Sequence, residues 1–162
     1  MSGVCREWEE AAAPAERAGA RVCVLRTAPV IDKSAPPLRQ LRWLFTLGLG
    51  ARLGAGGQHM PMVSLRDWLD AVVHVAEKTA ISGPVNICAP STPTNAEFTK
   101  ALGKALGRPT LLAVPGPVIR LGAGAAAPEL LGSLNVRPAV LLESGYGFSD
   151  ADVDAVLAAG LA

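Results

Sequence analysis

Three near-continuous apolar runs interrupt a chain whose polar and apolar residues otherwise follow helical spacing. The runs cover residues 20–25, 83–89 and 110–114, and each contains Val, Ile or Leu. Such runs are typical of strands that are buried on both faces of a parallel sheet. We therefore predict three strands, separated by helices and loops.

The N-terminal part of the chain predicts helices on either side of a loop. Residues 4–18 combine Ala, Glu and Arg with helical spacing and end at Gly19, a frequent helix stop. Pro14 favours a kink or two short helices within this segment. Residues 26–37 are predicted to form a loop, and residues 38–47 a helix.

Two capping patterns predict further helix starts. Ser64, with Asp67 three residues later, is typical of an N-cap, and the helix should continue to about Lys78. Thr94 and Glu97 match a capping box, in which each side chain bonds the backbone of the other residue, so we expect a second helix there.

The order of these elements predicts the fold class. The tail, residues 117–162, reads as short helices broken by Pro128, Pro138 and Gly145. Strands alternating with helices indicate an α/β fold. Three strands are too few for a free-standing doubly wound sheet. We therefore expect an incomplete Rossmann-like parallel sheet over residues 1–114 and a small, mostly helical lobe over residues 115–162. The missing strands would come from another segment or chain.

Composition excludes several classes of protein. The chain is 50% hydrophobic and 18% charged, which favours a globular protein over a disordered one. Its net charge of +1 argues against a nucleic-acid-binding role. The start of the chain is too acidic for a signal peptide, and no apolar run approaches the ~20 residues of a membrane helix. The odd, widely spaced cysteines, Cys5, Cys23 and Cys88, favour a reduced, cytoplasmic protein.

Glycine and histidine residues offer little chemistry. The glycines at 48–50 and 54–57 suggest a phosphate-binding loop, but no strand precedes them and no Lys-Ser or Lys-Thr follows, so turns explain them better. His74 lies in a predicted helix and is interpreted as structural. His59 lies in the glycine-rich stretch and could face a cleft.

Acidic and aromatic residues do not assemble a catalytic set either. Asp67 and Asp70 lie on one helix face, and we interpret them as a cap acid and a solvent-facing acid. The single tyrosine, Tyr146, lies late in the chain. From the residues alone we identify no catalytic residue and no metal site.

Several short motifs, in order, carry a resemblance to a known family. The matching stretches are Val4-Cys5-Arg6-Glu7-Trp8-Glu9, Val24-Leu25-Arg26-Thr27, Leu47-Gly48-Leu49-Gly50, Gly54-Ala55-Gly56-Gly57-Gln58, Thr94-Asn95-Ala96-Glu97-Phe98 and Leu102-Gly103-Lys104-Ala105-Leu106-Gly107-Arg108-Pro109. In the tail they are Val114-Pro115, Leu130-Leu131, Val136-Arg137-Pro138 and Gly145-Tyr146-Gly147-Phe148. On these stretches the chain resembles the C-terminal half of the epimerase family of extended short-chain dehydrogenase/reductases, with its C-terminal domain of unknown function.

The resemblance implies NAD or NADP held by an N-terminal Rossmann half, with a small-molecule substrate, a nucleotide sugar among the candidates, in the C-terminal lobe. The Gly-rich fingerprint of that half has no counterpart in this sequence. The Tyr-x-x-x-Lys pair would align at the start of the chain, where neither Met1 with Cys5 nor Ser2 with Arg6 supplies it. The usual proton relay to a carbonyl or hydroxyl is therefore not expected.

The resemblance also implies roles for particular residues. Thr27, Ala28, Pro29 and Val30 would pass the nicotinamide end of the cofactor. The residues expected near the substrate cleft are Gln58, Met60, Ser64 and Asp67. Ser64 stands where relatives often carry His, and Arg66 where they often carry an acid.

Three functions remain open from the sequence. The first is the substrate-side half of an epimerase-like oxidoreductase, inactive as an isolated chain. The second is a non-catalytic interaction module that pairs with a separate Rossmann chain or with itself. The third is an independent enzyme that uses His59 or Asp67.

Overall fold

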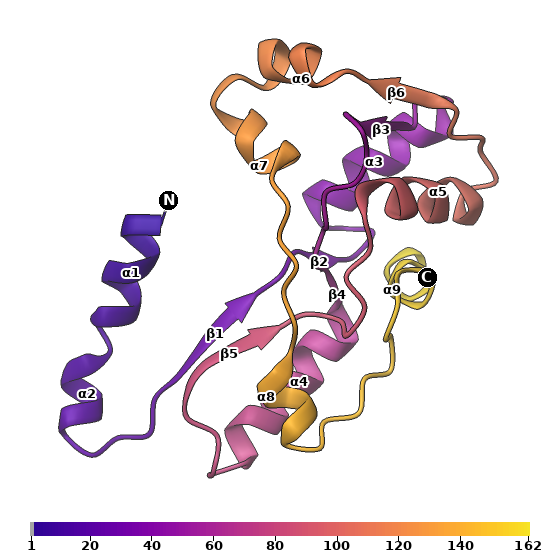
Figure 1. Cartoon of the computed structure of the whole chain (residues 1–162). Helices are drawn as coiled ribbons and strands as arrows, with labels where there is room; N and C mark the ends of the chain where they lie inside the picture. Colours follow the sequence, from indigo (N-terminus) through magenta and orange to yellow (C-terminus); the bar gives the residue numbers. More distant parts are fainter. Residues whose placement is uncertain (1) are drawn as a thin grey trace.

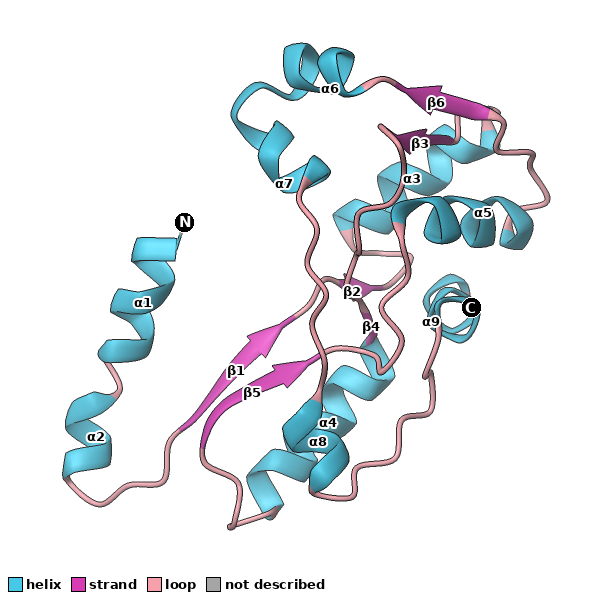
Figure 2. Cartoon of the chain, in the orientation of Figure 1, coloured by secondary structure: helices cyan, strands magenta, loops and turns pink. Residues whose placement is uncertain are grey.

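A computed structural model describes residues 2–162, in which pairs of short parallel strands lie among helices (Figures 1 and 2). The strand pairs are β1 (Cys23–Thr27) with β5 (Gly83–Ile87), β2 (Val30–Ile31) with β4 (Val63–Ser64), and β3 (Ala51–Leu53) with β6 (Leu112–Val114). In the longest pair, Cys23 stands opposite Gly83 and Thr27 opposite Ile87. The predicted α/β class with an incomplete parallel sheet is confirmed.

The helices follow in chain order. They are α1 (Ser2–Glu10), α2 (Ala13–Arg17), α3 (Pro36–Thr46), α4 (Leu65–Glu77), α5 (Asn95–Ala105), α6 (Gly116–Ala123), α7 (Ala127–Leu131), α8 (Ala139–Glu143) and α9 (Val153–Leu161), with a 3-10 turn at Gly124–Ala126. The first predicted helix is divided near Pro14, which occupies the first turn of α2.

Local capping explains the two helices with the clearest starts. The Ser64 hydroxyl accepts a hydrogen bond from the Asp67 backbone N–H at 3.2 Å and begins α4. Thr94 and Glu97 form the reciprocal capping box that begins α5. Both predicted starts are confirmed, because each depends on residues only three positions apart.

The strand predictions are incomplete. β5 and β6 form within the second and third apolar runs, whereas β1 begins at Cys23, inside the first run, and continues beyond it to Thr27. The segment expected to be a loop, residues 26–37, also contains β2 and the start of α3. β2, β3 and β4 are two or three residues long, too short to show a period, and they form through partners distant in sequence.

Two apolar clusters hold these elements together. One joins α3, α5 and α9 through Leu38, Phe98, Leu102 and Leu157. The other joins α4, β5 and α8 through residues that include Val75, Val85 and Leu141. Thus both α8 and α9, which lie in the tail, pack against elements from the first two thirds of the chain (Figure 1). The division at residues 114 and 115 stays a prediction.

The first two helices lie to one side of the remaining elements (Figure 1). Nearly all residues of α1 and α2 are exposed, and Trp8 is 75% exposed. Arg26 of β1 binds Glu9 of α1 through two hydrogen bonds of 2.8 Å. α1 and the end of β1 therefore face each other across an open space.

We predict that Gly160→Ala destabilises the fold. A Cβ atom at Gly160 would lie 2.8 Å from both the Cγ2 and the backbone oxygen of Ile31, and that oxygen is not free to rotate away. The expected loss in the free energy of unfolding is about 1 to 3 kcal/mol, measured by urea denaturation.

The matched control is Gly122→Ala, in α6, where a Cβ atom meets nothing within 4 Å. This variant should keep its stability or gain up to about 1 kcal/mol, because Ala favours a helix over Gly. Equal losses in both variants would contradict the predicted contact between α9 and β2.

Candidate functional site

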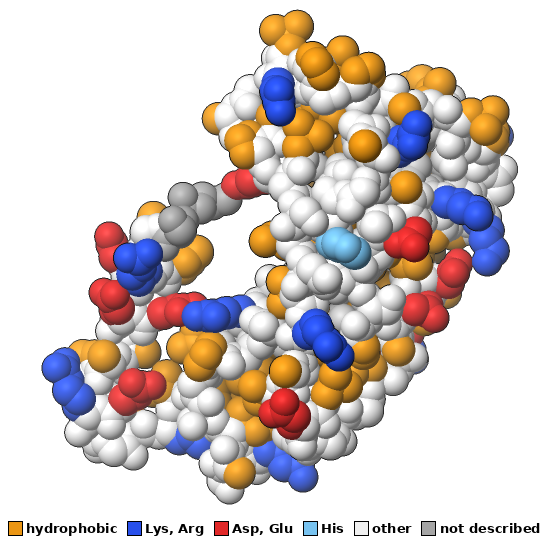
Figure 3. Space-filling view, viewed as in Figure 1, with side chains coloured by type: hydrophobic (Ala, Val, Ile, Leu, Met, Phe, Trp, Pro, Cys, Tyr) orange, Lys and Arg blue, Asp and Glu red, His pale blue; other side chains and the backbone are white. Residues whose placement is uncertain are grey.

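A cavity of about 900 Å³ lies between α1, the end of β1 and the segment that joins α7 to α8. The surface is hollowed there in the space-filling view (Figure 3). Thr27, Ala28 and Pro29 form part of its wall. In open parallel α/β sheets, ligands bind beyond the carboxyl ends of the strands, and these residues stand at that end of β1.

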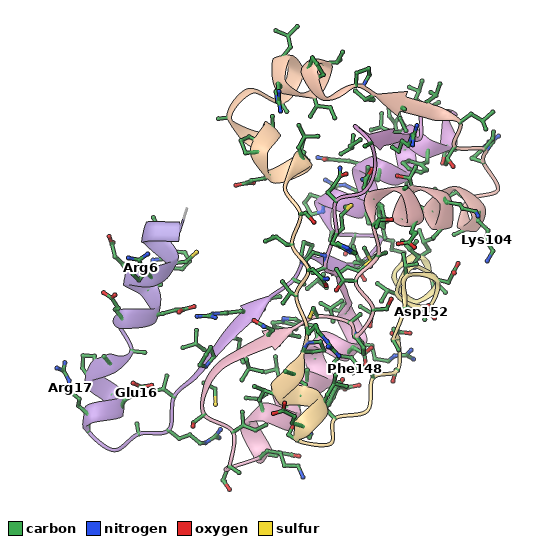
Figure 4. All side chains as sticks on the ribbon, in the orientation of Figure 1. Arg6, Glu16, Arg17, Lys104, Phe148 and Asp152 are labelled. Atoms are coloured by element: carbon green, nitrogen blue, oxygen red, sulfur yellow. The ribbon has the colours of Figure 1, made fainter. Side chains whose placement is uncertain are left out.

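Charged side chains line the α1 side of the cavity. Arg6, labelled in Figure 4, lies on α1 with Glu9, and Arg26 reaches Glu9 from β1. The hydrogen bonds from Arg26 hold the pKa of Glu9 below its ordinary value, and the same pair raises the pKa of Arg26. Glu9 is therefore an ionised partner of Arg26 and is unsuited to act as a general acid at neutral pH.

The opposite wall comes from residues 132–138, which we call the strap. The strap is pinned by hydrogen bonds on both sides: the Leu134 N–H donates to the His59 carbonyl at 3.1 Å, and the Thr92 hydroxyl donates to the Val136 carbonyl at 2.9 Å. The Asn86 side-chain amide donates to the Arg137 carbonyl at 3.2 Å. Leu134 and Val136 thereby line the cavity.

The structure separates the four residues expected at the nicotinamide end of the cofactor. Thr27, Ala28 and Pro29 line the cavity. Val30 begins β2, stands opposite Val63 and packs on the apolar cluster around α4. A role in cofactor binding stays a prediction for all four.

The four residues expected at the substrate cleft also serve contacts within the fold. The Gln58 side chain donates to the carbonyls of Leu53 and Leu130, and the Met60 sulfur accepts from the Asn95 amide. Ser64 and Asp67 are fully buried. None of the four is among the residues that line the 900 Å³ cavity.

Asp67 is the centre of a buried polar network. Its two carboxylate oxygens accept hydrogen bonds from the consecutive backbone N–H groups of Ser149 and Asp150, at 2.9 and 2.7 Å. The Tyr146 hydroxyl donates to the same carboxylate at 3.1 Å. The interpretation of Asp67 as a simple cap acid was therefore incomplete, whereas Asp70 is exposed as expected.

A second carboxylate extends this network. Asp150, 4% exposed, accepts from the Ser64 hydroxyl at 2.6 Å and from Arg66 at 2.8 Å. The sequence does not predict these hydrogen bonds between α4 and the tail. No pattern around Asp67 indicates them, although the stretch around Tyr146 is one of the motifs that carry the family resemblance.

Tyr146 is held away from the cavity. It packs edge-on against Phe148, labelled beside α8 in Figure 4, and against His74. Burial, then the charge of Asp67 and the hydrogen bond to it, raise the pKa of Tyr146 above its ordinary value. The hydroxyl is thus a structural donor.

Among the described residues, the remaining polar groups form no recognisable catalytic set. His59 Nδ1 lies 3.1 Å from the Thr92 carbonyl, beside a smaller hollow of about 600 Å³ that Glu97 and Lys104 also line. Within residues 2–162, no group of three or more His, Cys, Asp or Glu side chains could hold a metal ion. No helix in the described part of the chain is long and apolar enough to cross a membrane.

The expectation that no strand precedes the glycines at 54–57 is wrong, because β3 ends at Leu53. No helix begins at these glycines, however, so they do not form a strand–turn–helix phosphate loop. A Cβ atom at Gly50 would lie 2.7 Å from the Phe45 ring, and one at Gly56 would lie 3.0 Å from the Ala96 Cβ. These glycines permit close packing against α3 and α5. The described residues supply no glycine-rich turn that leads into a helix N-terminus, the arrangement that receives the pyrophosphate of a nicotinamide cofactor.

Known proteins resemble this chain in both sequence and fold. Residues 114–159 match the family model described as a domain of unknown function, DUF1731. An epimerase family protein of Mycobacterium tuberculosis is 42% identical over 149 residues, which cover 91% of this chain and 50% of the relative. The resemblance to the epimerase family is confirmed.

Two solved structures of epimerases share the fold. The human epimerase family protein SDR39U1, solved with NADPH, is 32% identical with a TM-score of 0.79, over 85% of this chain and 47% of that one. A nucleoside-diphosphate sugar epimerase from Corynebacterium glutamicum is 31% identical with a TM-score of 0.77, over 98% of this chain and 30% of that one. The chain spans about half the length of the curated epimerase family relatives that it matches.

We predict that Asp67→Asn destabilises the protein by about 1 to 3 kcal/mol. Each carboxylate oxygen faces one backbone N–H, so whichever way the new amide is turned, its NH₂ group meets a donor at Ser149 or Asp150. Urea denaturation measures the loss. Asp70→Asn, on the same helix but exposed, should change stability by less than about 0.5 kcal/mol; equal effects would contradict the network.

We also predict a loss of stability at alkaline pH that depends on Tyr146. The pKa of Tyr146 is raised in the folded state, so the tyrosine of the unfolded chain ionises first as the pH rises. The stabilisation that the Tyr146 hydroxyl gives the fold is therefore fully present below the ordinary pKa of 10.0 and is lost as the pH rises above that value. The stability difference between the wild type and Tyr146→Phe should therefore shrink above pH 10.0. A difference that stays constant on both sides of that pH would contradict the prediction.

Proposed function

We propose that this chain forms the substrate-side half of an NAD(P)-dependent oxidoreductase of the epimerase type, acting on a small molecule. The observation that carries the proposal is the cavity at the carboxyl end of β1, in a chain whose human relative was solved with NADPH. The residues around that cavity bind and orient a ligand rather than transform it.

Thr27, Ala28 and Pro29 would hold the nicotinamide end of the cofactor against β1. When bound, the cofactor would supply hydride transfer. Leu134 and Val136 would exclude water from the same space. Gln58 and Met60 would act as positioning residues, because they fix the segment that precedes β4.

Activity would require a cofactor-binding half that supplies the pyrophosphate site and a proton donor. The single tyrosine donates its hydrogen bond to Asp67, and Gly50 and Gly56 of the glycine stretches pack closely against α3 and α5. We therefore propose that the isolated chain is inactive, whether that half comes from the same polypeptide or from another. The three free cysteines support a reducing compartment, such as the cytoplasm.

A second candidate function is a non-catalytic interaction module. Among the described residues, β1 and β5 form a two-stranded sheet, so each has an outer edge without a partner strand. Leu25 of β1 and Trp8 of α1 are both exposed and line the cavity beside this sheet. Unpaired edges and exposed apolar side chains favour association with a Rossmann chain or with a second copy.

The cofactor proposal is tested by titrating NADPH against the intrinsic tryptophan fluorescence of the isolated chain, since Trp8 lines the cavity. We expect no saturable change in the micromolar range, because the ring contacts alone omit the pyrophosphate. The full-length human relative serves as the positive control. Micromolar binding by the isolated chain would contradict its need for a separate cofactor-binding half.

In a complementary experiment, the chain is mixed with the separately expressed nucleotide-binding half of the human relative, and NADPH binding is measured again. Saturable NADPH binding should require the mixture and exceed that of the added half alone. If the chain forms a complex but NADPH binding is unchanged, the interaction module is the better function.

A further inference from the structure

The strap side of the cavity carries no charged side chain, whereas the α1 side carries Arg6 and Glu9. The strap side is lined by Pro61, Cys88, Leu134 and Val136. Leu134 is 64% exposed, and it is held toward the cavity by the backbone hydrogen bond to His59. This wall therefore offers hydrophobic contact to whatever occupies the cavity.

Cys88 lies beneath this wall and offers no reactive thiol. The residue is 1% exposed, and its thiol points to the Val136 carbonyl at 3.7 Å. Burial raises the pKa of Cys88 to about 11, so the thiol is neutral at physiological pH. A neutral, buried thiol behaves as a small hydrophobic group.

The uncharged polar side chains of the cavity are largely committed within the protein. The Asn86 amide nitrogen donates to Arg137, and the Thr27 oxygen accepts from the Trp68 indole N–H at 3.2 Å. What they can still offer a ligand is the Thr27 hydroxyl hydrogen, the second N–H of the Asn86 amide and the Asn86 carbonyl oxygen. These few groups come from two side chains and match one or two carbonyl or hydroxyl groups, not a ring that carries several hydroxyls.

We propose that the strap wall binds the apolar body of an uncharged small molecule that carries a carbonyl or hydroxyl group, rather than the sugar ring of a nucleotide sugar. Each sugar hydroxyl buried against Leu134 and Val136 would lose its water without gaining a partner. The proposal rests on the proposed function, because it assigns the substrate class of the same cavity.

The test compares two probes on the isolated chain by methyl-resolved NMR. The probes are 2-acetylnaphthalene, an uncharged aryl ketone, and UDP-glucose. The Leu134 and Val136 methyl signals report on the strap. We expect the ketone to shift both signals in a saturable way, and UDP-glucose to leave them unchanged.

A matched pair of variants makes the result specific. Leu134→Asn should weaken ketone binding about tenfold, the effect of removing hydrophobic contact from a binding pocket. Because Leu134 is exposed, the substitution should not unfold the chain, and the Val136 signals still report binding. Leu121→Asn is the control: Leu121 is 89% exposed and is not a cavity residue, so ketone affinity should not change.

Three outcomes would overturn the proposal. They are strap signals that respond to UDP-glucose but not to the ketone, equal ketone affinity in the two variants, and no strap response to either probe. Because no cofactor is present, the result is independent of the NADPH titration. If the isolated chain binds both the ketone at the strap and NADPH, the proposed substrate class stands, and the proposed need for a separate cofactor-binding half is refuted.

Discussion

The carboxylate of Asp67 is the contact on which the arrangement of the tail depends. It accepts two consecutive backbone N–H groups from residues that lie 82 and 83 positions later in the chain. A buried charge needs such partners, because its desolvation is otherwise uncompensated. The contact fixes the segment between α8 and α9, and so helps to place Leu141 and Leu157 in the two apolar clusters.

The hydrogen bonds of Asp67 also help to position the strap, because they hold the segment that follows α8. It joins α7, which packs near α6, to α8, which packs on β5. Its own hydrogen bonds to His59 and Thr92 then hold it against the loops that follow β3 and β5. The strap is thus held by hydrogen bonds to its main chain, while its Leu134 and Val136 side chains remain available to a ligand.

How far the sequence predicts this fold depends on the range of each interaction. The starts of α4 and α5 follow from Ser64 and Thr94, whose caps close within three residues. β1 and β5 follow from apolar runs long enough to recognise. β2 and β4 depend on each other across the chain, and so does the pairing of Asp67 with the tail. Of the candidate site, sequence resemblance led to Thr27, Ala28 and Pro29, but the strap wall could not be anticipated, because it exists only once α8 is docked.

Residues 114–159, which match the domain of unknown function, contribute to both apolar clusters. They supply Leu141 to the cluster that contains Val85, and Leu157 to the cluster that contains Leu102. Excising this stretch would therefore expose side chains that the two clusters bury, both in the stretch itself and in the part of the chain that it leaves.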